Sequence, residues 1–347
     1  MKASYQKYLL HFKRPSGTSR GILKTKETWF LILKDLENWG VGECGILRGL
    51  SIDDRPDYEE KLQWVCHNIQ LGKEVLYDNL TEFPSIQMGV ETAFKSLASQ
   101  DSFQLFPSPF FEGNATIPIN GLIWMGDKRF MKEQISAKLK EGFTCIKMKI
   151  GAIDFKTELE LLKSIRKEFS VSEIELRVDA NGAFATSEAF EKLKRLSDHQ
   201  LHSIEQPIQP KQWQEMARLC EQTPIPIALD EELIGVFSSE EKEALLQTIQ
   251  PQYLILKPSF IGGFRGSDAW IELAEKYNAG WWVTSALESN VGLNAISQYT
   301  FTKKSKLPQG LGTGSLYTNN IDSPLVVSKG KIEYQPSKSW DIKKLNL

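Results

Sequence analysis

Two patterns of apolar and polar residues follow each other along the chain and meet near residue 115. In the first pattern, residues 28–33 (TWFLIL) form an apolar run typical of a strand, and residues 39–45 (WGVGECG) predict a glycine-rich turn. Apolar residues spaced three and four apart then predict two helices, at 57–70 and 85–99. The first part of the chain therefore has the pattern of an α+β domain.

A different pattern begins after the proline-rich break at 106–114 (FPSPFFEGN), where short apolar segments alternate with amphipathic, charged segments. This alternation predicts parallel strands joined by helices in right-handed crossovers. Eight strands favour a closed TIM-like (β/α) barrel, with an open doubly wound sheet as the alternative, because a sequence cannot show closure. The predicted strands are 116–122, 144–150, 175–179, 201–205, 227–230, 253–257, 281–285 and 309–312.

Composition and charge exclude several classes of function. The 42 Lys and Arg residues nearly balance the 44 Asp and Glu residues, so no bulk field attracts nucleic acid or anionic lipid. The four cysteines show no C-x-x-C pairing, which argues against structural zinc and a disulfide scaffold. No stretch reaches the ~18 apolar residues of a membrane span, and no export signal is evident. We expect a cytoplasmic protein whose partner is a small molecule.

Acidic residues stand at the ends of three successive predicted strands. These are Asp179 (RVDANG), Glu205 (SIEQP) and Asp230 (IALDEE), and Lys257 (LILKPS) ends the next strand. Because the carboxyl ends of barrel strands share one mouth, we expect these side chains to converge there. Three clustered carboxylates repel one another unless a hard cation binds them, and oxygen ligands without His or Cys favour Mg²⁺. The sequence therefore predicts a magnesium site.

Each acid taken alone has a simpler interpretation, since a strand-terminal Asp or Glu often caps the next helix or starts a turn. Three of them in successive units, followed by a lysine, favour a site. Glu231 and Glu232, which follow Asp230 directly, are expected to be solvated or to support the ligands.

Two lysines share one face of the predicted strand 144–150. The two-residue period puts Lys147 and Lys149 toward the barrel interior, while Ile146, Met148 and Ile150 face the helices. Mutual repulsion and a nearby cation are expected to lower the pKa of at least one lysine, which makes it a candidate general base. The alternative is a pair of lysines on an exposed strand edge in weak salt bridges.

A dication beside a lysine base suits removal of a proton from carbon next to a carboxylate. Lys149, with Lys147, approaches a substrate from one side, and Lys257 approaches it from nearly across the barrel. The opposite lysine either returns a proton, which gives racemisation, or stays cationic while a leaving group departs. Both outcomes remain open on the residues alone.

These residues resemble the enolase superfamily, muconate-lactonizing-enzyme subgroup, over nearly the whole chain. The K-x-K motif matches Lys147 and Lys149, and the D-x-N motif matches Asp179 and Asn181. The next metal ligands match Glu205 and Asp230, and the sixth-strand lysine matches Lys257. The resemblance implies an α+β capping domain (1–115, joined by the tail 320–347) over a (β/α)7β barrel (116–319).

Within the subgroup, the chain most resembles the o-succinylbenzoate synthase family. The segment 284–293 (TSALESNVGL) lacks the D-x-D of dipeptide epimerases. The turn 310–320 is rich in glycine, whose backbone N–H groups could hold a carboxylate. The loop 14–21 resembles a mobile cap loop, although a solvated hairpin arginine is an equally good interpretation of its Arg20. The expected substrate-contacting residues are Asn181, Ser285, Glu288, Ser289, Gly312, Thr313 and Arg20.

The resemblance implies a Mg²⁺-dependent dehydration in menaquinone biosynthesis. Lys149 would remove the α-proton of 2-succinyl-6-hydroxy-2,4-cyclohexadiene-1-carboxylate, with Mg²⁺ on the three acids. Loss of the hydroxyl from the same face would give aromatic o-succinylbenzoate. Lys257 would stay cationic, and Lys147 would lower the pKa of the base.

Two other functions remain as alternatives. The nearer one is racemisation or epimerisation of an N-acylamino acid or dipeptide, for which two opposed lysines suffice. The other, from a different class, is a non-catalytic metal-binding barrel that serves as a scaffold. The oligomeric state does not follow from the sequence.

Overall fold

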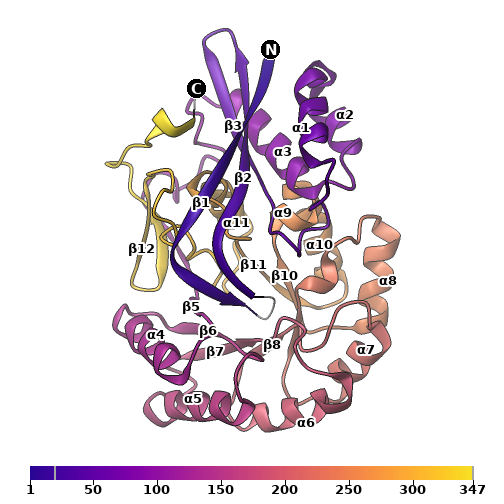
Figure 1. Ribbon diagram of the computed structural model, residues 1–347, viewed down its shortest axis with the longest axis vertical. Helices are drawn as coiled ribbons and strands as arrows, with labels where there is room; N and C mark the ends of the chain where they lie inside the picture. The colour runs from indigo at the N-terminus through magenta and orange to yellow at the C-terminus, as the bar shows by residue number, and fades with distance from the viewer. Residues whose placement is uncertain (19–20, 346–347) are drawn as a thin grey trace.

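The computed structural model describes residues 1–18 and 21–345, in which a long antiparallel sheet with helices stands over a ring of parallel strands (Figure 1). The sheet has the order β1-β2-β3, formed by β1 (Lys2–Thr18), β2 (Gly21–Asp35) and β3 (Asn38–Gly45). The far end of the β1–β2 hairpin reaches the barrel, where residues of both strands line the same cavity as barrel residues. The N-terminal region thus contributes directly to the barrel mouth.

The two faces of β2 pack against different parts of the molecule. Trp29, Leu31 and Leu33 belong to a core shared with the N-terminal helices, whereas Phe30 and Ile32 face residues from the C-terminal half. This is the two-residue alternation expected of a strand that is buried on both sides. The N-terminal helices are α1 (Tyr58–His67), η1 (Ile69–Leu71), α2 (Gly72–Asp78) and α3 (Pro84–Ala98).

The segment predicted as a glycine-rich turn is strand β3, so that prediction was wrong. Its glycines allow close packing instead: a Cβ added at Gly42 would lie 1.9 Å from the carbonyl oxygen of Gly89 on α3. A Cβ added at Gly40 would lie 2.4 Å from the carbonyl oxygen of Ala93. Glycine within a strand often marks such an approach of another backbone.

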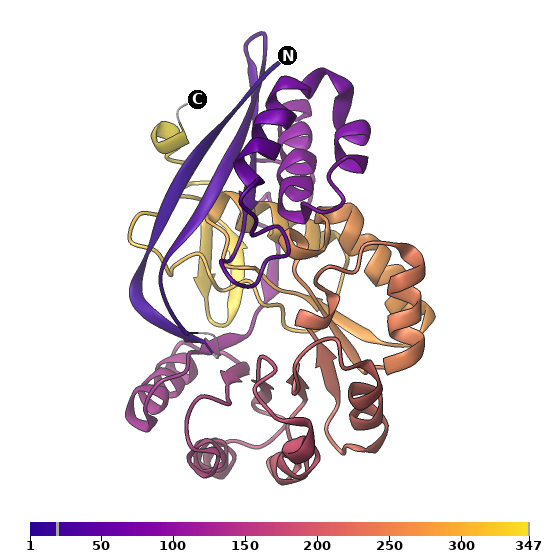
Figure 2. The ribbon, with the colours of Figure 1, turned by 45° about the vertical axis from the view of Figure 1, so that its right-hand side comes forward.

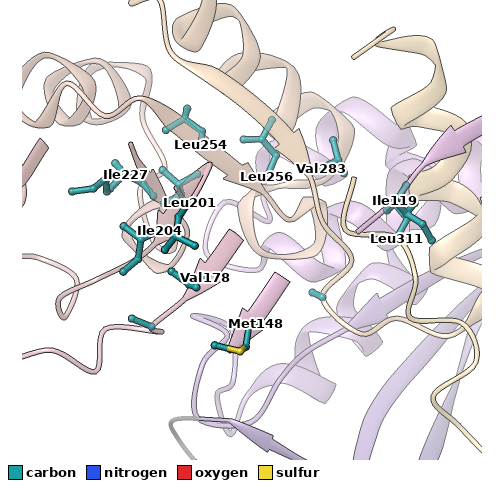
Figure 3. Close-up of a cluster of buried hydrophobic side chains, with 14 of the residues drawn as sticks. Ile119, Met148, Val178, Leu201, Ile204, Ile227, Leu254, Leu256, Val283 and Leu311 are labelled. Carbon is teal, nitrogen blue, oxygen red and sulfur yellow. The ribbon is translucent and has the colours of Figure 1, made fainter. Parts of the chain in front are cut away.

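Seven parallel strands form the barrel sheet, and their order follows the sequence without interruption. Helices on the outside connect them and cover an apolar layer, of which Figure 3 labels residues from successive strands. The strands are β5 (Gly121–Ile123), β6 (Cys145–Lys149), β7 (Glu175–Asp179), β8 (Ser203–Glu205), β9 (Ile227–Leu229), β10 (Tyr253–Leu256) and β11 (Gly280–Val283).

The barrel helices follow these strands in the chain, and η2 (Glu231–Leu233) follows β9. No helix in the described ranges combines the length and apolar character needed to cross a membrane. The helices are α4 (Lys128–Lys140), α5 (Phe155–Glu168), α6 (Thr186–Ser197), α7 (Trp213–Gln222), α8 (Ser239–Ile249), α9 (Pro258–Ile261), α10 (Gly263–Lys276) and α11 (Asn290–Thr302).

Two of the eight predicted strands differ from the structure. The segment 116–122 divides into β4 (Thr116–Pro118) and β5, because Pro118 lacks an amide for a continuous ladder and the chain changes partners there. The segment 309–312 is not a regular strand. Its Gln309 bridges to Ile119 and its Gly310 to Thr284, which joins the first and last strands and closes the ring.

The C-terminal segment returns to both parts of the molecule. Strands β12 (Leu325–Ser328) and β13 (Lys331–Tyr334) form a small antiparallel sheet with β4, and η3 (Ile342–Leu345) follows. Leu345 then packs with Phe30 and Ile32 of the N-terminal sheet. The C-terminal segment that ends with η3 thus lies beside the N-terminal sheet in both views (Figures 1 and 2).

Candidate active site

The carboxyl ends of successive barrel strands bring the predicted acids together. Lys149 and Asp179 are paired across β6 and β7, and Asp179 and Glu205 are paired across β7 and β8. Asp230 directly follows β9, and one oxygen from each of the three acids lies within 4.8 Å of the others. The in-register parallel pairing therefore produces the convergence that the sequence predicts.

Lysines pair with all three carboxylates in this cluster. Lys147 Nζ contacts Glu205 Oε2 and lies 3.0 Å from Asp179 Oδ2, and Lys149 Nζ is also 3.0 Å from Asp179 Oδ2. On the other side, Lys257 Nζ donates to Asp230 Oδ2 at 2.5 Å. The cluster thus contains three acidic and three basic groups.

The pKa values of the acids reflect this crowding. Burial alone would raise the pKa of Asp179, but Lys147, Lys149 and Lys257 hold it well below its usual range. Burial raises the pKa of Glu205 to about 7, and the neighbouring acids add to this effect while Lys147 opposes it. A third negative charge is therefore costly in this cluster unless more positive charge is nearby.

The three acids fit a hard divalent cation. They supply only oxygen ligands, and Glu205 Oε1 is buried without a hydrogen-bond partner among the described residues. A buried carboxylate oxygen without a partner is costly, and coordination to a cation would satisfy it. The unpartnered Glu205 Oε1 therefore supports a cation site independently of the clustering of the three acids.

The lowering of a lysine pKa beside a bound cation stays a prediction, and the groups of the cluster itself act in the other direction on Lys147. Burial lowers the pKa of Lys147, but Asp179, Glu205 and Asp230 outweigh burial and raise it. The same balance of burial against Asp230 and Glu231 raises the pKa of Lys257. The acids, rather than lysine–lysine repulsion, dominate the electrostatics of the cluster.

The polar residues that follow the acids are buried and engaged. Asn181 accepts a hydrogen bond from Lys149 Nζ at 2.7 Å and donates to Glu231 at 3.0 Å. Glu232 accepts from Gln206 Nε2 at 3.0 Å. Of the two expectations for Glu231 and Glu232, solvent exposure does not hold, and support of neighbouring groups agrees with their burial and hydrogen bonds.

A cavity of about 790 Å³ lies over this cluster, within the size range of small-molecule sites. Lys147, Lys149, Asp179, Asn181 and Lys257 line its polar side. Its other walls are largely apolar and come from both parts of the chain; they include Leu23, Leu47, Leu50, Trp124, Phe130 and Leu287. An organic acid with an apolar body would find both kinds of surface here.

Most of the predicted substrate-contacting residues border this cavity. Asn181, Ser285, Gly312 and Thr313 line it. Glu288 and Ser289 are absent from the described lining and are buried beside it, where Glu288 accepts from Ser259 and Ser289 caps α11. Direct contact of these two residues with a substrate stays a prediction. Arg20 lies outside the described residues.

Several residues that surround the site were not predicted from any sequence pattern. Leu47 and Leu50 come from a loop after β3, and Trp124 follows β5. Lys26 and Glu43 are buried charged residues of the N-terminal sheet that contact or face the segment carrying Ser285. Of these residues, only Glu43 carried a sequence signal of burial, because it is an acid among the small and apolar residues of the segment 39–45.

The comparisons with known proteins agree with this geometry. A family model described as "Enolase C-terminal domain-like" matches residues 131–337. The chain is 46% identical to an o-succinylbenzoate synthase of Desulfotalea psychrophila, over 95% of this chain and 98% of the relative. The crystal structure of MenC from Desulfotalea psychrophila LSv54 has a TM-score of 0.86 and 42% identity, and covers 96% of this chain and 99% of that one.

A more distant structure shares the fold alone. The L-Ala-D/L-Glu epimerase from Bacillus subtilis, solved as a substrate-liganded complex, has a TM-score of 0.82 at 20% identity, with 96% of each chain covered. These matches confirm the predicted TIM-like barrel with an α+β cap. The family model covers more than half of the chain, so the resemblance in the sequence is confirmed: the chain belongs to the enolase superfamily.

Proposed function

We propose that the chain is an o-succinylbenzoate synthase, a lyase that dehydrates 2-succinyl-6-hydroxy-2,4-cyclohexadiene-1-carboxylate to o-succinylbenzoate. The 46% identity to a curated synthase over 95% of the chain supports this proposal. One structural observation carries the chemistry: a buried acidic triad and three lysines meet at the polar side of one cavity. The dehydration belongs to menaquinone biosynthesis.

Each group of the cluster has a proposed role. Asp179, Glu205 and Asp230 would hold Mg²⁺, which when bound supplies positive charge against the substrate carboxylate and makes its α-proton more acidic. Lys149, which borders the cavity, removes that proton. The same lysine then gives a proton to the departing hydroxyl, because both groups leave from one face.

The remaining lysines act through charge. Lys257 stays protonated beside Asp230 and faces the cavity from the strand that follows the acids. Lys147 bridges Asp179 and Glu205, and it sits two residues before Lys149 on β6. Its proposed role is electrostatic, because its ammonium group stands beside the base and between two of the acids.

The substrate is proposed to contact further polar residues and a glycine of the cavity lining. Asn181, Ser285, Gly312 and Thr313 are the proposed contacts, and their place in the cavity lining supports this role. Arg20 remains a proposed carboxylate partner. We also propose the division into a cap (1–115 with 320–347) and a barrel (116–319), and a cytoplasmic location, for which the four cysteines being free thiols is supporting evidence.

Epimerisation is the second candidate, because Lys149 and Lys257 both border the cavity from different strands. Incubation in D₂O separates the two activities. A synthase converts the cyclohexadiene acid to a product with aromatic absorbance, and conversion must stop with a chelator and in Lys149→Ala. A racemase instead introduces deuterium into recovered N-acylamino acid or dipeptide. Absence of aromatic product with the wild-type chain and Mg²⁺ would overturn the proposed function.

A non-catalytic scaffold predicts a different result from the same assay. It would leave wild type and Lys149→Ala equally inactive with every substrate, although both would bind Mg²⁺.

A further inference from the structure

A buried glutamine lies among the segments that carry the three acids. Gln206 directly follows Glu205 and is 0% exposed, so its side-chain amide must find its hydrogen-bond partners within the protein. Its backbone has a φ of +37°, in the left-handed region where glycine is favoured and other residues are strained. A glycine would suit this backbone better, which indicates that the glutamine side chain has a role of its own.

The side-chain oxygen of Gln206 holds the backbone at the third acid. Oε1 accepts hydrogen bonds from the backbone N–H groups of Asp230 and Glu232, both at 3.2 Å. Both of these residues are buried, with exposed fractions of 2% and 3%. A buried N–H group without an acceptor is costly, so this oxygen stabilises the backbone in the position that it has here.

The side-chain nitrogen of Gln206 is equally well placed. Nε2 donates to the carbonyl oxygen of Ile208 at 3.1 Å and to Glu232 Oε2 at 3.0 Å. The other oxygen of Glu232 accepts from the N–H of Lys211 at 2.6 Å. Two backbone donors meet Oε1 and two acceptors meet Nε2, so the partners determine the orientation of the amide and use all four of its hydrogen-bonding positions.

The backbone of Gln206 connects the neighbouring strands as well. Its N–H donates to the carbonyl oxygen of Ala228 on β9 at 3.0 Å, and its carbonyl oxygen accepts from the N–H of Gly182 at 2.7 Å. Gly182 lies three residues after Asp179. Gln206 therefore begins the segment after β8 and contacts the segments that carry the other two acids.

We propose that Gln206 is a positioning residue for the metal site: its side-chain amide fixes the backbone at Asp230 relative to Glu205, so that the three carboxylates keep the spacing that a small cation needs. The three ligand oxygens lie within 4.8 Å of one another. Mg²⁺ requires near-ideal geometry with metal–oxygen distances of about 2.0–2.1 Å, so displacement of one ligand weakens binding. Residues that orient metal ligands typically contribute about 10–100-fold to metal affinity. The inference rests on the proposed function for the presence of a cation at the three acids.

A second buried glutamine allows this role to be separated from stabilisation of the fold. Gln298 on α11 is also 0% exposed, and its Oε1 accepts from the backbone N–H groups of Leu105 at 2.9 Å and Phe106 at 3.0 Å. Its Nε2 donates to the carbonyl oxygen of Phe103 at 2.7 Å and to Asn294 Oδ1 at 2.8 Å. Gln298 thus has the same pattern of hydrogen bonds, but its partners belong to segments that carry none of the three acids.

Titration calorimetry with Mg²⁺ on the full chain, without substrate, compares wild type with Gln206→Met and Gln298→Met. Methionine has a similar length and no charge, but it lacks the amide. We expect the Kd for Mg²⁺ to rise about tenfold or more in Gln206→Met and to change by less than about twofold in Gln298→Met. Both variants should have a lower melting temperature without metal, since each leaves two backbone N–H groups without their acceptor.

An unchanged Kd for Mg²⁺ in Gln206→Met would overturn the proposal. An equal rise of Kd in both variants would overturn it too, because the effect would then follow the loss of stability rather than the position of the ligands. If Gln206→Met does not fold, Gln206→Gly, which suits the left-handed backbone, takes its place with the same expected rise of Kd.

The same titrations separate this proposal from the proposed function. A wild-type chain that binds no Mg²⁺ would overturn both the role of Gln206 and the proposed metal site. A wild-type chain that binds Mg²⁺ but forms no aromatic product would overturn only the proposed reaction, and the Kd values of the two variants would still decide the role of Gln206.

Discussion

Two buried ionic clusters in this chain compensate their buried charges in different ways. The active-site cluster balances Asp179, Glu205 and Asp230 with three lysines, and most contacts are ion pairs between side chains. A second cluster, which we call the seam cluster, lies where the N-terminal sheet meets the barrel and consists of the buried residues Lys26, Glu43 and Glu288. Its two carboxylates accept hydrogen bonds from hydroxyl and backbone N–H groups.

The difference indicates what each cluster can do. Hydrogen bonds from the start of α11 and from fixed serines hold the seam acids in one arrangement. In the active-site cluster, by contrast, Glu205 Oε1 remains without a partner in the described chain, and the lysine tips are held mainly by charge. Such a cluster can exchange partners with a cation and a substrate, whereas the seam cluster serves to fix geometry.

Metal removal should distinguish the clusters most strongly. Because a Lewis acid contributes several kcal/mol to such a step, chelation should reduce turnover by about 10³-fold or more, and added Mg²⁺ should restore it. Mg²⁺ should also raise the melting temperature of wild type, since it binds the folded state, and it should do so much less in Asp230→Asn. Turnover that is indifferent to EDTA would contradict this assignment.

Lys149→Ala should remove the base without removing the fold. We expect kcat to fall by about 10²–10⁴-fold, the usual contribution of a general base, with a melting temperature close to that of wild type. Lys167→Ala, on the exposed side of α5, is the matched control and should keep full turnover. The prediction fails if both variants retain comparable kcat values.

Unlike Lys149→Ala, Glu43→Ala should act mainly on the stability of the fold. The substitution leaves the N–H groups of Ser289 and Gly292 without their acceptor and removes one of the two acids that act on Lys26, so the free energy of unfolding should fall by about 3–5 kcal/mol. Chemical denaturation measures this change, with the exposed Glu37→Ala as control. A loss below about 1 kcal/mol would mean that the seam cluster is not held as tightly as its hydrogen bonds indicate.

Glu91 on α3 extends the comparison to a buried acid outside the seam cluster. It accepts from the N–H groups of Phe264 at 2.6 Å and Arg265 at 3.2 Å at the start of α10, and burial raises its pKa to about 7. The unfolded chain ionises near its ordinary value of 4.5, so Glu91 contributes stability at low pH that is lost as pH rises through about 7.

The effect of this acid is the smallest we predict, at most about 3 kcal/mol. Glu91→Gln should gain melting temperature relative to wild type between about pH 4.5 and 7.5, and the difference should then stay constant. Glu272→Gln, an exposed acid of α10, should show no such gain. If the melting temperatures of wild type and Glu91→Gln change with pH in the same way across this range, the predicted ionisation of Glu91 is excluded.

The site residues were predictable where backbone register alone determines their position. Asp179, Glu205, Asp230 and Lys257 end consecutive parallel strands, and the two-residue period places Lys147 and Lys149 on the same side. These facts require only local patterns and the common direction of barrel strands. The resemblance to a known superfamily then supplied the chemistry.

Other features depend on contacts between distant segments and were missed. The glycines of β3 signal packing against α3, which a single sequence cannot distinguish from a turn. Glu288 is buried with its carboxylate hydrogen-bonded to Ser259 and Ser285, and Lys26 is buried with its Nζ beside Gly45 of the neighbouring strand. Closure of the ring likewise depends on two isolated bridges, at Gln309 and Gly310, rather than on a strand.

The most direct test of the central claim uses substrate deuterated at the carbon next to the ring carboxylate. If Lys149 removes this hydrogen, wild-type chain with Mg²⁺ should form aromatic product more slowly than from unlabelled substrate and release the deuterium, and Lys149→Ala should form almost none. Equal rates of product formation by wild type and Lys149→Ala would contradict the account.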